Sequence, residues 1–485
     1  MKNLLVMKFG GTSMGSAARI AAAAEICAGQ RRQRPVLVVV SAMSKITDLL
    51  LDTLRLAEAG DGAAVEANIQ KLQDRHLDAA GELFPADRQD AVRAGIHDLA
   101  AEFQRIANGV LMLGERPPRS VDEAVAIGER LSVLLLSSWL ETAGTPAVGI
   151  NAGDIIVTDA VFGNATPLMD PTREKARRNL LPWLESGVLP VVTGFNGATA
   201  DGRPTTLGRG GSDFSASILA AALDASELWI WTDVDGIMTA DPRLVSDAAV
   251  LDEVSYREAA ELAWNGAKVL HPRTLAPLIE KRIPVWSKNS FAMEKRGTKI
   301  VPEVRVPGGA RAVTSMANVA LVSVDIVGPG MNATQVMARS LDALARANTE
   351  VLALSSSSYR QNFCFLVRKE ELRPALSSLE ANFALELAHE YVAPFEVNED
   401  VGLLAVVGEG MQGTPGLAGR IFTAISRENI NIIAIAQGSS ELTIAIVVER
   451  SRLEKAVQAV HAECRMAEQA LGKSAPEPPG GITTR

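Results

Sequence analysis

The sequence predicts an α/β protein in which a mainly parallel central sheet, with helices on both faces, is followed by two smaller α+β units. Two observations predict the first part. Buried strand-like runs alternate with helical patterns up to about residue 290, and polar or glycine-rich segments follow the strand-like runs. A third observation predicts the second part, because an internal repeat occupies much of the remaining chain.

The first two predicted strands are short and apolar. Residues 4–9 are expected to form a buried strand, and a glycine turn then leads into an alanine-rich helix from about Ser16 to Ala28. The run 36–40 is continuously apolar and β-branched, which is typical of a strand covered on both faces. A polar loop at residues 41–44 follows it and leads into the next helix.

A long helical region separates these strands from the next ones. Residues 47–145 show a helical pattern, and further strands are expected at 188–193, 228–231 and 283–286 with helices between them. In such sheets, ligands bind outside the carboxyl ends of the strands. The polar segments that follow strands therefore mark the expected site, and they are 10–13, 41–47, 194–197 and 232–236.

The internal repeat lies beyond a segment whose prolines and glycines, between residues 302 and 309, suit a linker. The motif that begins at Gly328 recurs at Gly408, and the motif that ends at Asn348 recurs 81 positions later at Asn429. Each copy is predicted to run strand, glycine turn, helix, strand, serine-rich turn, strand, helix.

These patterns predict four parts of the chain. We expect the sheet-forming domain at 1–302, the two repeat units at 311–392 and 396–470, and a tail at 472–485 that is rich in Pro, Gly, Ser and Thr and is disordered.

Composition excludes several classes of protein. The net charge of −9 gives no reason to expect nucleic acid or an anionic membrane as a partner. Three scattered cysteines without a C-x-x-C pair argue against a disulfide framework or a structural zinc site, so a cytoplasmic protein with reduced thiols is expected. The sequence contains no uninterrupted run of 18 apolar residues, so no membrane span is expected.

The first chemical signal is Lys8 with Gly10 and Gly11. A lysine at a strand end, beside glycines whose backbone amides can approach closely, suits a phosphate group. The combination is common by chance, and it is not a Walker A loop, since no G-x-x-x-x-G-K-[ST] occurs.

The second signal is the segment 205–213, in which three glycines surround Arg209 and a Ser-Asp pair opens an apolar helix. A helix start offers free amides, and an arginine can bind a carboxylate with two hydrogen bonds. The simpler alternative is that Ser212 and Asp213 only cap the helix, which leaves Arg209 and the glycines unexplained.

Three weaker signals remain. The segment 231–236 and the residues 241–243 supply aspartates that could be turn formers only, and 266–272 supplies Lys268, which alone would read as a surface lysine. Glu129 stands on an otherwise apolar helix. The simpler interpretation is that it lies at the rim of the helix face without a chemical role. Lysines, an arginine, glycines and a few acids at strand ends are what phosphoryl transfer needs.

Four segments, 8–13, 206–213, 231–236 and 266–272, together resemble the aspartate kinase family in order and spacing. The likeness covers about residues 1–470 and is greatest to archaeal monofunctional enzymes and to the kinase half of bifunctional aspartokinase–homoserine dehydrogenases. It implies a three-layer amino-acid-kinase domain followed by two ferredoxin-like ACT domains. It also implies transfer of the ATP γ-phosphoryl to the β-carboxylate of L-aspartate, the first step towards lysine, threonine and methionine.

The resemblance also implies site residues. The expected catalytic residues are Lys8, Asp213 and Lys268. The expected ATP contacts are Lys8, Gly10, Gly11, Ser13, Thr232, Asp233, Met238, Arg243 and Lys268. The expected aspartate contacts are Ser41, Thr47, Glu129 and Arg209, with Arg209 on the α-carboxylate and Glu129 on the ammonium. Mg²⁺ is expected to bind mainly through the ATP phosphates, without a protein metal site.

The repeat is expected to bind an effector through Asn431 and Gln437. Two positions depart from the family pattern. Met238 stands where many relatives have a tyrosine beside the adenine, so stacking is expected to be softer. Ser356 lies opposite Gln437 in the repeat, so one of the two customary effector sites lacks its glutamine.

The resemblance to threonine-sensitive relatives implies threonine as the first expected effector and lysine as the second, and a homodimer or homotetramer through the ACT domains is expected. Two other functions stay open. One is a kinase of the same fold with another acceptor, such as acetylglutamate, glutamate or UMP. The other is a non-catalytic amino-acid sensor that keeps the ACT domains.

Overall fold

The computed structural model describes residues 3–267, 270–304, 309–328, 331–357, 362–466 and 470. The chain forms two compact units. The first contains Met1–Ile237, Asp252–Tyr256 and Leu270–Glu303, and the second contains Met238–Leu251, Arg257–Val269 and Val304–Arg485. Two segments that precede residue 302 thus belong to the second unit, while the predicted domain limits themselves stay predictions.

The first unit is built on an eight-stranded sheet with the order β3-β5-β2-β1-β8-β10-β11-β9. Its strands are β1 (Leu5–Phe9), β2 (Val36–Val40), β3 (Ala147–Ile150), β5 (Leu189–Thr193), β8 (Glu227–Thr232), β9 (Glu253–Ser255), β10 (Val285–Asn289) and β11 (Thr298–Val301). All neighbours are parallel except β10 and β11. The predicted mainly parallel α/β sheet is confirmed.

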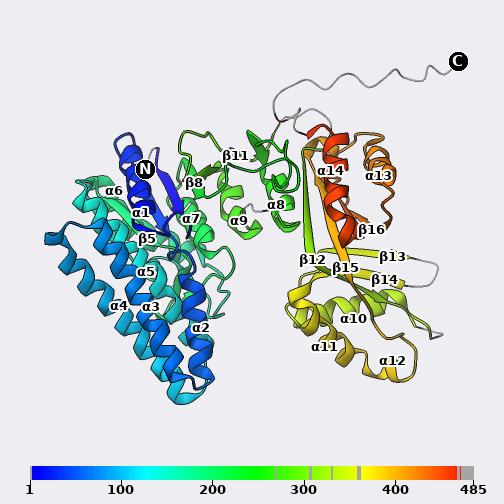
Figure 1. Ribbon diagram of the computed structural model, residues 1–485, viewed down its shortest axis with the longest axis horizontal. Helices are drawn as coiled ribbons and strands as arrows, with labels where there is room; N and C mark the ends of the chain where they lie inside the picture. Colours follow the sequence, from blue (N-terminus) through cyan, green and yellow to red (C-terminus); the bar gives the residue numbers. More distant parts are fainter. Residues whose placement is uncertain are drawn as a thin grey trace. The chain divides into compact units, whose positions relative to one another are not determined.

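Eight α-helices are described in this unit. They are α1 (Ala17–Arg31), α2 (Ile46–Glu58), α3 (Gly62–Leu83), α4 (Ala86–Leu113), α5 (Pro118–Thr142), α6 (Met169–Ser186), α7 (Gly211–Ala222) and α9 (Pro272–Lys281). The helix α8 (Tyr256–Trp264) belongs to the second unit from Arg257 onwards. Figure 1 shows α2 to α5 as long helices side by side. Ser16 caps α1 by accepting a hydrogen bond from the Arg19 N–H, which explains the predicted helix start.

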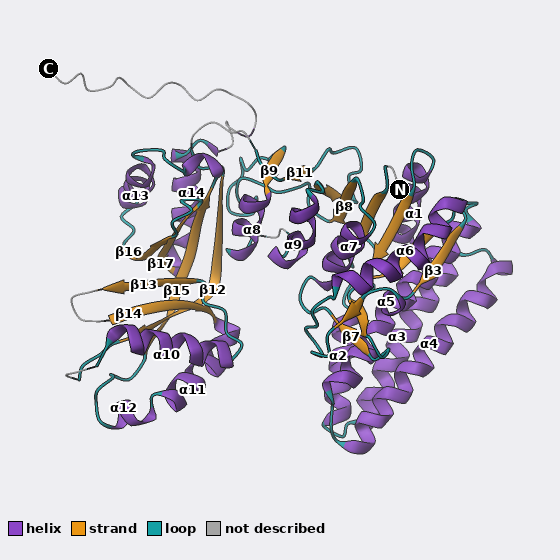
Figure 2. Ribbon diagram, turned by 180° about the vertical axis from the view of Figure 1, so that it is seen from behind, coloured by secondary structure: helices purple, strands orange, loops and turns teal. Residues whose placement is uncertain are grey.

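The two faces of the sheet carry different helices. Leu5, Met7 and Phe9 of β1 pack into one apolar cluster with α1 and α5. Because side chains alternate along a strand, Lys8 points to the opposite face, where α7 packs on β1, β2 and β8 with α6 and α9 beside it. Figure 2 shows these layers of helices and strands.

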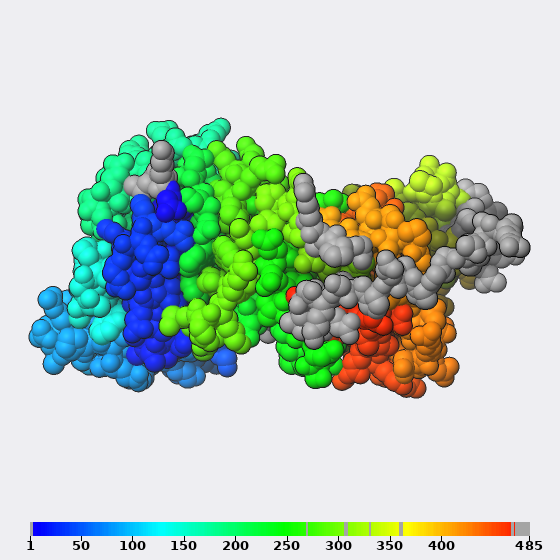
Figure 3. All heavy atoms as spheres, turned by 90° about the horizontal axis from the view of Figure 1, so that it is seen from above, coloured from blue at the N-terminus to red at the C-terminus, as the bar shows by residue number. Residues whose placement is uncertain are grey.

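The strand ends meet at one edge of the sheet, as predicted. The Gly10 N–H donates to Trp231 O at 3.2 Å, the Ser41 N–H to Phe9 O at 3.0 Å, and the Gly194 N–H to Val40 O at 2.8 Å. In Figure 3, blue residues of the N-terminal segment lie directly beside green residues from the middle of the chain. The segments that follow β1, β2, β5 and β8 are therefore neighbours.

A second, three-stranded sheet lies in the first unit. Its strands are β4 (Val157–Thr158), β6 (Asn196–Thr199) and β7 (Pro204–Thr206), with β6 paired antiparallel to β7. The short strand β7 leads directly into the glycine-rich segment before α7, so this sheet fixes where that segment starts.

The second unit contains a six-stranded sheet with the order β13-β14-β12-β15-β17-β16, antiparallel throughout. Its strands are β12 (Ala312–Val324), β13 (Ala353–Ser357), β14 (Asn362–Arg368), β15 (Glu396–Val407), β16 (Ile432–Gln437) and β17 (Thr443–Glu449). Its helices are α10 (Ala333–Arg346), α11 (Leu372–Asn382), α12 (Ala384–Ala388), α13 (Leu417–Arg427) and α14 (Leu453–Glu463).

The internal repeat is confirmed by this unit. The order β12-α10-β13-β14-α11 returns as β15-α13-β16-β17-α14, and β14 and α11 recur 81 positions later as β17 and α14. Asn348 and Asn429, the pair that revealed the repeat, both have a φ of 54°. This left-handed conformation is tolerated by asparagine, and it ends each helix in the same way.

Three expectations concern residues that the structure does not describe. Lys268 and residues 305–308 of the predicted linker are not among the described residues, and neither is the tail from 472 to 485. Within the described residues, no helix combines the length and the apolar character that a bilayer crossing requires.

Candidate functional site

Lys8 and Asp213 form the centre of the candidate site. Lys8 Nζ lies 2.6 Å from Asp213 Oδ1, and the two side chains are 10% and 20% exposed. Asp213 stands in the first turn of α7, where the helix dipole favours a carboxylate. The pair holds the lysine at the end of β1, and an ammonium group has further N–H donors for a second acceptor.

The glycines after β1 keep the space around this lysine free. A Cβ atom on Gly10 would lie 3.4 Å from Lys8 Nζ, and a Cβ atom on Gly11 would lie 3.1 Å from Ala42 O. Side chains here would crowd the ammonium group and the loop after β2. The arrangement suits an anion that contacts both Lys8 and backbone amides.

Ser13 is fully buried rather than open to a ligand. Its Oγ lies 2.8 Å from the Oγ of Ser290 and 3.4 Å from Trp231 O, so it ties the glycine turn to the ends of β8 and β10. The expectation that Ser13 contacts ATP stays a prediction.

Glu129 of α5 is a buried acid whose two carboxylate oxygens have different surroundings. The Ala42 N–H donates to Oε1 at 3.2 Å, while Oε2 is buried and has no hydrogen-bond partner among the described residues. Burial raises the pKa of Glu129 to about 8, although the backbone hydrogen bond and the charge of Lys8 act in the opposite direction. A buried carboxylate oxygen without a donor suits a cationic group such as an ammonium.

The other predicted aspartate contacts surround this carboxyl group or lie on the glycine-rich segment. Ser41 directly follows β2 and precedes Ala42, whereas Thr47 lies in the first turn of α2. Arg209 is exposed between Gly208 and Gly210, which have φ values of 75° and 68°. These left-handed glycines turn the chain sharply and present Arg209 at the surface just before Asp213.

Asp122 is a buried residue that sequence reasoning missed. Its Oδ2 accepts hydrogen bonds from the Gly163 N–H at 2.8 Å and the Thr206 N–H at 2.9 Å, and its Oδ1 accepts from Thr206 Oγ1 at 2.8 Å. Burial raises the pKa of Asp122, opposed by these hydrogen bonds. Asp122 precedes Glu129 by two helical turns on the same apolar helix, and this spacing was the available signal.

Asp122 therefore anchors the start of the segment that carries Arg209 and Asp213. A second anchor comes from α9, because Arg273 binds the side chain of Asn164 in the loop next to Gly163. A Cβ atom on Gly210 would lie 2.9 Å from His271 Cβ, so α9 also packs closely on the glycine turn.

The predicted nucleotide contacts fall in two groups. Thr232 ends β8, where its carbonyl oxygen accepts from the Ser290 N–H at 2.9 Å, and the exposed Asp233 follows. Met238 and Arg243 belong to the second unit, where Met238 pairs with Val250 and Arg243 forms an ion pair with Asp241. The structure thus joins Lys8, Gly10, Gly11 and Thr232 in one unit and Met238 with Arg243 in the other, while Lys268 is not described.

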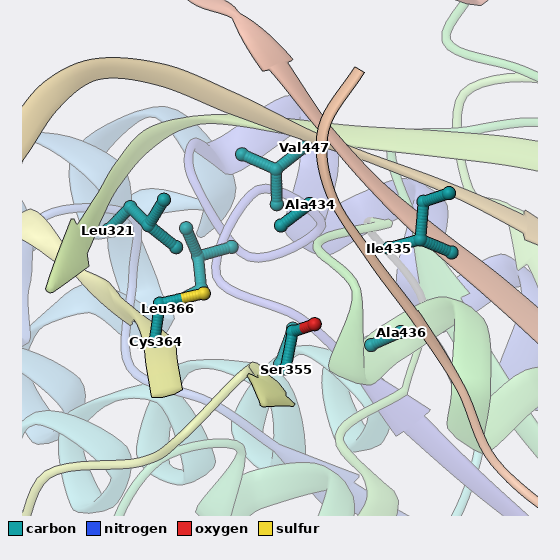
Figure 4. A pocket seen from close by; sticks show the side chains of 9 residues that line it. Leu321, Ser355, Cys364, Leu366, Ala434, Ile435, Ala436 and Val447 are labelled. Atoms are coloured by element: carbon teal, nitrogen blue, oxygen red, sulfur yellow. The ribbon is translucent and has the colours of Figure 1, made fainter. Parts of the chain in front are cut away.

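The predicted effector residues lie at one edge of the six-stranded sheet. Asn431 immediately precedes the edge strand β16, and Gln437 ends it, both with exposed side chains. Ser356 holds the matching position in β13, the opposite edge strand. A small apolar pocket lies between residues of these two edges, and Figure 4 shows Ser355 and Cys364 on one side of it and Ala434 and Ala436 on the other.

Among the described residues, no group of three or more His, Cys, Asp or Glu side chains is arranged to hold a metal ion. The side chains gathered here can neutralise phosphate charge and bind a small zwitterion, but they do not form a protein cage for a cation.

Comparisons with known proteins identify relatives of both units. Residues 3–289 match the amino acid kinase family, and residues 324–383 and 404–464 each match the ACT domain. The chain is 31% identical to lysine-sensitive aspartokinase 3 of Escherichia coli, over 95% of this chain and 99% of that protein. The crystal structure of E. coli aspartokinase III in complex with aspartate and ADP, in the R-state, is similar with a TM-score of 0.81 and 30% identity, covering 95% and 99% of the two chains.

A bifunctional protein is also similar. The chain is 34% identical over 465 residues to the chloroplastic bifunctional aspartokinase/homoserine dehydrogenase 1 of Arabidopsis thaliana. This match covers 94% of this chain and 50% of the relative, so the chain spans about half the length of that protein.

Proposed function

The chain belongs to the aspartokinase branch of the amino acid kinase family, and on this premise we propose that it transfers the γ-phosphoryl group of ATP to the β-carboxylate of L-aspartate, giving 4-phospho-L-aspartate. The observation that carries the proposal is the ion pair between Lys8, which precedes the glycine turn, and Asp213. In the loop after β2, the Ala42 N–H donates a hydrogen bond to Glu129. Together these contacts support one place for a phosphate and a separate place for an ammonium group.

Each side chain has a defined task in this proposal. Lys8 neutralises charge that develops on the transferred phosphoryl oxygens, and Asp213 keeps the Lys8 ammonium group at the right position. Gly10 and Gly11 let the phosphates approach the backbone. Lys268 is proposed as a second cation for the phosphates, and Thr232, Asp233, Met238, Arg243 and Ser13 as further nucleotide contacts.

The acceptor is held by opposite charges at its two ends. Glu129 binds the ammonium group of aspartate, and Arg209 binds the α-carboxylate with its planar guanidinium. Ser41 and Thr47 flank the β-carboxylate with hydroxyl groups. This arrangement leaves the β-carboxylate as the end of the molecule that faces Lys8.

Mg²⁺ is proposed to accompany ATP and to bind mainly through the phosphates. Magnesium at phosphoryl-transfer sites keeps few protein ligands and is held largely by the substrate phosphates. The ion would add to the charge neutralisation that Lys8 supplies.

Regulation is proposed to pass through the ACT repeat, with Gln437 and Asn431 as effector contacts. Threonine is the preferred effector and lysine the second, and the lysine-sensitive relative in E. coli supports the lysine alternative. We propose a homodimer or homotetramer through this repeat and a cytoplasmic location. Titrating threonine and lysine separately and together, while following ADP release and molecular mass, distinguishes these alternatives.

The acceptor is tested with a substrate panel. ADP release in the presence of ATP and Mg²⁺ is measured with L-aspartate, L-glutamate, N-acetylglutamate, UMP and no acceptor. Stimulation by L-aspartate alone supports the proposal. Stimulation by another acceptor would identify a kinase of the same fold with another substrate, and no stimulation by any acceptor would support an amino-acid sensor.

A further inference from the structure

The segment 238–251 of the second unit forms a closed turn. Met238 pairs with Val250 in an antiparallel bridge, and the Thr239 N–H donates to Ala249 O at 2.9 Å. This nucleotide turn, as we call residues 238–251, carries Met238 and Arg243, both proposed nucleotide contacts.

The ACT repeat holds the nucleotide turn with hydrogen bonds. The Val313 N–H of β12 donates to Thr239 O at 2.8 Å, and Gln458 Nε2 of α14 donates to Leu244 O at 2.8 Å. Ala240 and Val245 of the turn pack in one apolar cluster with residues of α14. The last helix of the repeat is therefore part of the support of this turn.

His461 of α14 makes the most specific of these contacts. Its side chain is 2% exposed, its Nε2 lies 2.9 Å from Thr239 Oγ1, and its Nδ1 lies 3.7 Å from Asp247 Oδ1. Thr239 is fully buried, and its Oγ1 already accepts the Ala249 N–H at 3.0 Å. The threonine hydroxyl proton is thus available for donation to Nε2 of a neutral imidazole whose proton is on Nδ1.

We infer that His461 is a positioning residue for nucleotide binding: by accepting the Thr239 hydroxyl proton, it fixes the nucleotide turn in the conformation that presents Met238 and Arg243. The inference rests on the proposed function. It assigns the regulatory repeat a part in holding two of the proposed nucleotide contacts.

The neutral form of His461 is the one that fits. A protonated imidazole would donate from Nε2 to Thr239 Oγ1, which would leave the buried threonine hydroxyl proton without its acceptor. The charged groups nearby are Asp247, which faces Nδ1, and Arg243 and Glu454, which line the same surface pocket as His461. Burial lowers the pKa of His461, opposed by Asp247, in keeping with a neutral ring.

The test compares His461→Leu, which removes the acceptor, with His461→Gln, whose side-chain oxygen reaches a similar distance. Each full-length variant is assayed for kcat, for the KM values of ATP and L-aspartate, and for the Kd of ADP with Mg²⁺ by calorimetry. Loss of one buried hydrogen bond is expected to raise the KM for ATP and the Kd for ADP roughly fivefold in His461→Leu. His461→Gln is expected to stay within about twofold of the wild type, and kcat and the KM for L-aspartate are expected to change less than about twofold in both.

Two controls separate positioning from general stability. Leu379→Ala removes a buried side chain of α11 that packs in a separate apolar cluster from that of the nucleotide turn, so it should lower Tm and leave nucleotide affinity unchanged. Thr239→Val removes the same hydrogen bond from the other side, together with the acceptor of the Ala249 N–H, whereas Thr239→Ser keeps the hydroxyl. Thr239→Val should weaken nucleotide binding at least as much as His461→Leu, and the double variant should be no worse than Thr239→Val.

Equal nucleotide affinity in His461→Leu, His461→Gln and the wild type would overturn the inference. The same proportional changes of kcat, both KM values and Tm in His461→Leu and in Leu379→Ala would also overturn it. If His461→Leu does not fold, the comparison of Thr239→Val with Thr239→Ser decides. Failure of the proposed function looks different, because the wild type itself would then release no ADP in response to L-aspartate.

Discussion

Lys8 Nζ lies 2.6 Å from Asp213 Oδ1, and this ion pair joins the first strand of the chain to the first turn of α7. The two residues lie on the same face of the sheet because Lys8 alternates with Met7 and Phe9, which pack against the other layer of helices. The pair thus forms as a direct result of the sheet topology.

Replacing Lys8 tests the chemical role of this pair. Lys8→Met is expected to lower kcat at least 100-fold, because the charge that offsets the developing phosphoryl charge is lost. Tm should change by only a few degrees, since Asp213 stays near a helix N-terminus that favours a carboxylate. Steady-state kinetics and thermal unfolding measure the two effects.

Lys281→Met is the matched control. Lys281, the last residue of α9, also forms a lysine–aspartate pair. Its partner is Asp224, which follows the end of α7, at 2.7 Å. Lys281→Met should keep kcat within about twofold, as expected for a partly exposed ion pair. Similar losses of activity in both variants would contradict a specific role for Lys8.

Glu129→Gln is expected to have opposite effects on function and stability. The pKa of about 8 lies above the ordinary glutamate pKa of 4.5, so the buried carboxyl group lowers the stability increasingly as pH rises from 4.5 to 8. At pH 7 this cost is about 3 kcal/mol, since one pKa unit corresponds to about 1.4 kcal/mol. Glu129→Gln should therefore raise the Tm of the ligand-free protein at pH 7 and raise the KM for L-aspartate at least tenfold.

Glu258→Gln is the control for this effect. Glu258 is also buried, but it accepts from Arg311 Nη1 at 2.8 Å and from the Glu409 N–H at 2.8 Å. Removing a paired buried charge destabilises a protein, by about 3–5 kcal/mol in typical cases. A fall of Tm in both variants would show that Glu129 is stabilised in the folded protein and would refute its assignment as an unpaired acid.

Asp122→Asn is expected to weaken aspartate binding without removing any contact to the substrate. Asp122 accepts three hydrogen bonds from Gly163 and Thr206, and an amide keeps only one acceptor oxygen. The segment that carries Arg209 should loosen, so the KM for L-aspartate should rise roughly tenfold and the KM for ATP much less.

A double-mutant cycle with Thr206 identifies the contact responsible. Asp122→Asn and Thr206→Val should be coupled by about 1 kcal/mol, whereas Thr206→Ser, which keeps the hydroxyl, should resemble the wild type. Full additivity of the two changes would exclude the hydrogen bond from Thr206 Oγ1 as the cause.

His76 is expected to make the first unit sensitive to acid. It is buried in α3, where Nδ1 lies 2.7 Å from Leu72 O and Nε2 has no partner among the described residues. Burial lowers its pKa from 6.5 to about 4, so the unfolded chain binds the proton first as pH falls. Stability should therefore fall by up to about 3 kcal/mol between pH 6.5 and pH 4 and should not depend on this group above pH 6.5.

His76→Leu removes this titrating group, and the exposed His97→Gln serves as its control. Chemical denaturation at pH 7 and pH 5 should show a smaller loss of stability in His76→Leu than in the wild type and no difference in His97→Gln. An equal loss in all three proteins would assign acid sensitivity to other groups.

The sequence predicted the parts of the fold that repeat a simple pattern. The buried runs that became β1 and β2 are apolar at every position, and the strand ends beside them gathered as expected for parallel neighbours. The repeat was visible because Asn348 and Asn429 occupy equivalent helix ends. The strand expected at residue 283 begins at Val285, because Arg282 ends α9 in a left-handed conformation with φ of 54°.

Other features depend on contacts that no local pattern reveals. The strands β6 and β7 contain Asn, Gly and Pro and are too short for an alternation to be seen, yet they set the start of the glycine-rich segment. Nothing near Met238 or Arg243 in the sequence indicates that their turn packs on α14. Asp122 looks like an ordinary helix residue until Thr206 is brought beside it.

The most direct test of the central claim is formation of aspartyl hydroxamate from ATP, Mg²⁺, L-aspartate and hydroxylamine, with the protein shown to be folded by circular dichroism. The wild type should form the hydroxamate in amounts equal to the ADP released, and Lys8→Met should form at least 100-fold less. Folded wild-type protein that forms no hydroxamate, or Lys8→Met that forms as much as the wild type, would contradict the account.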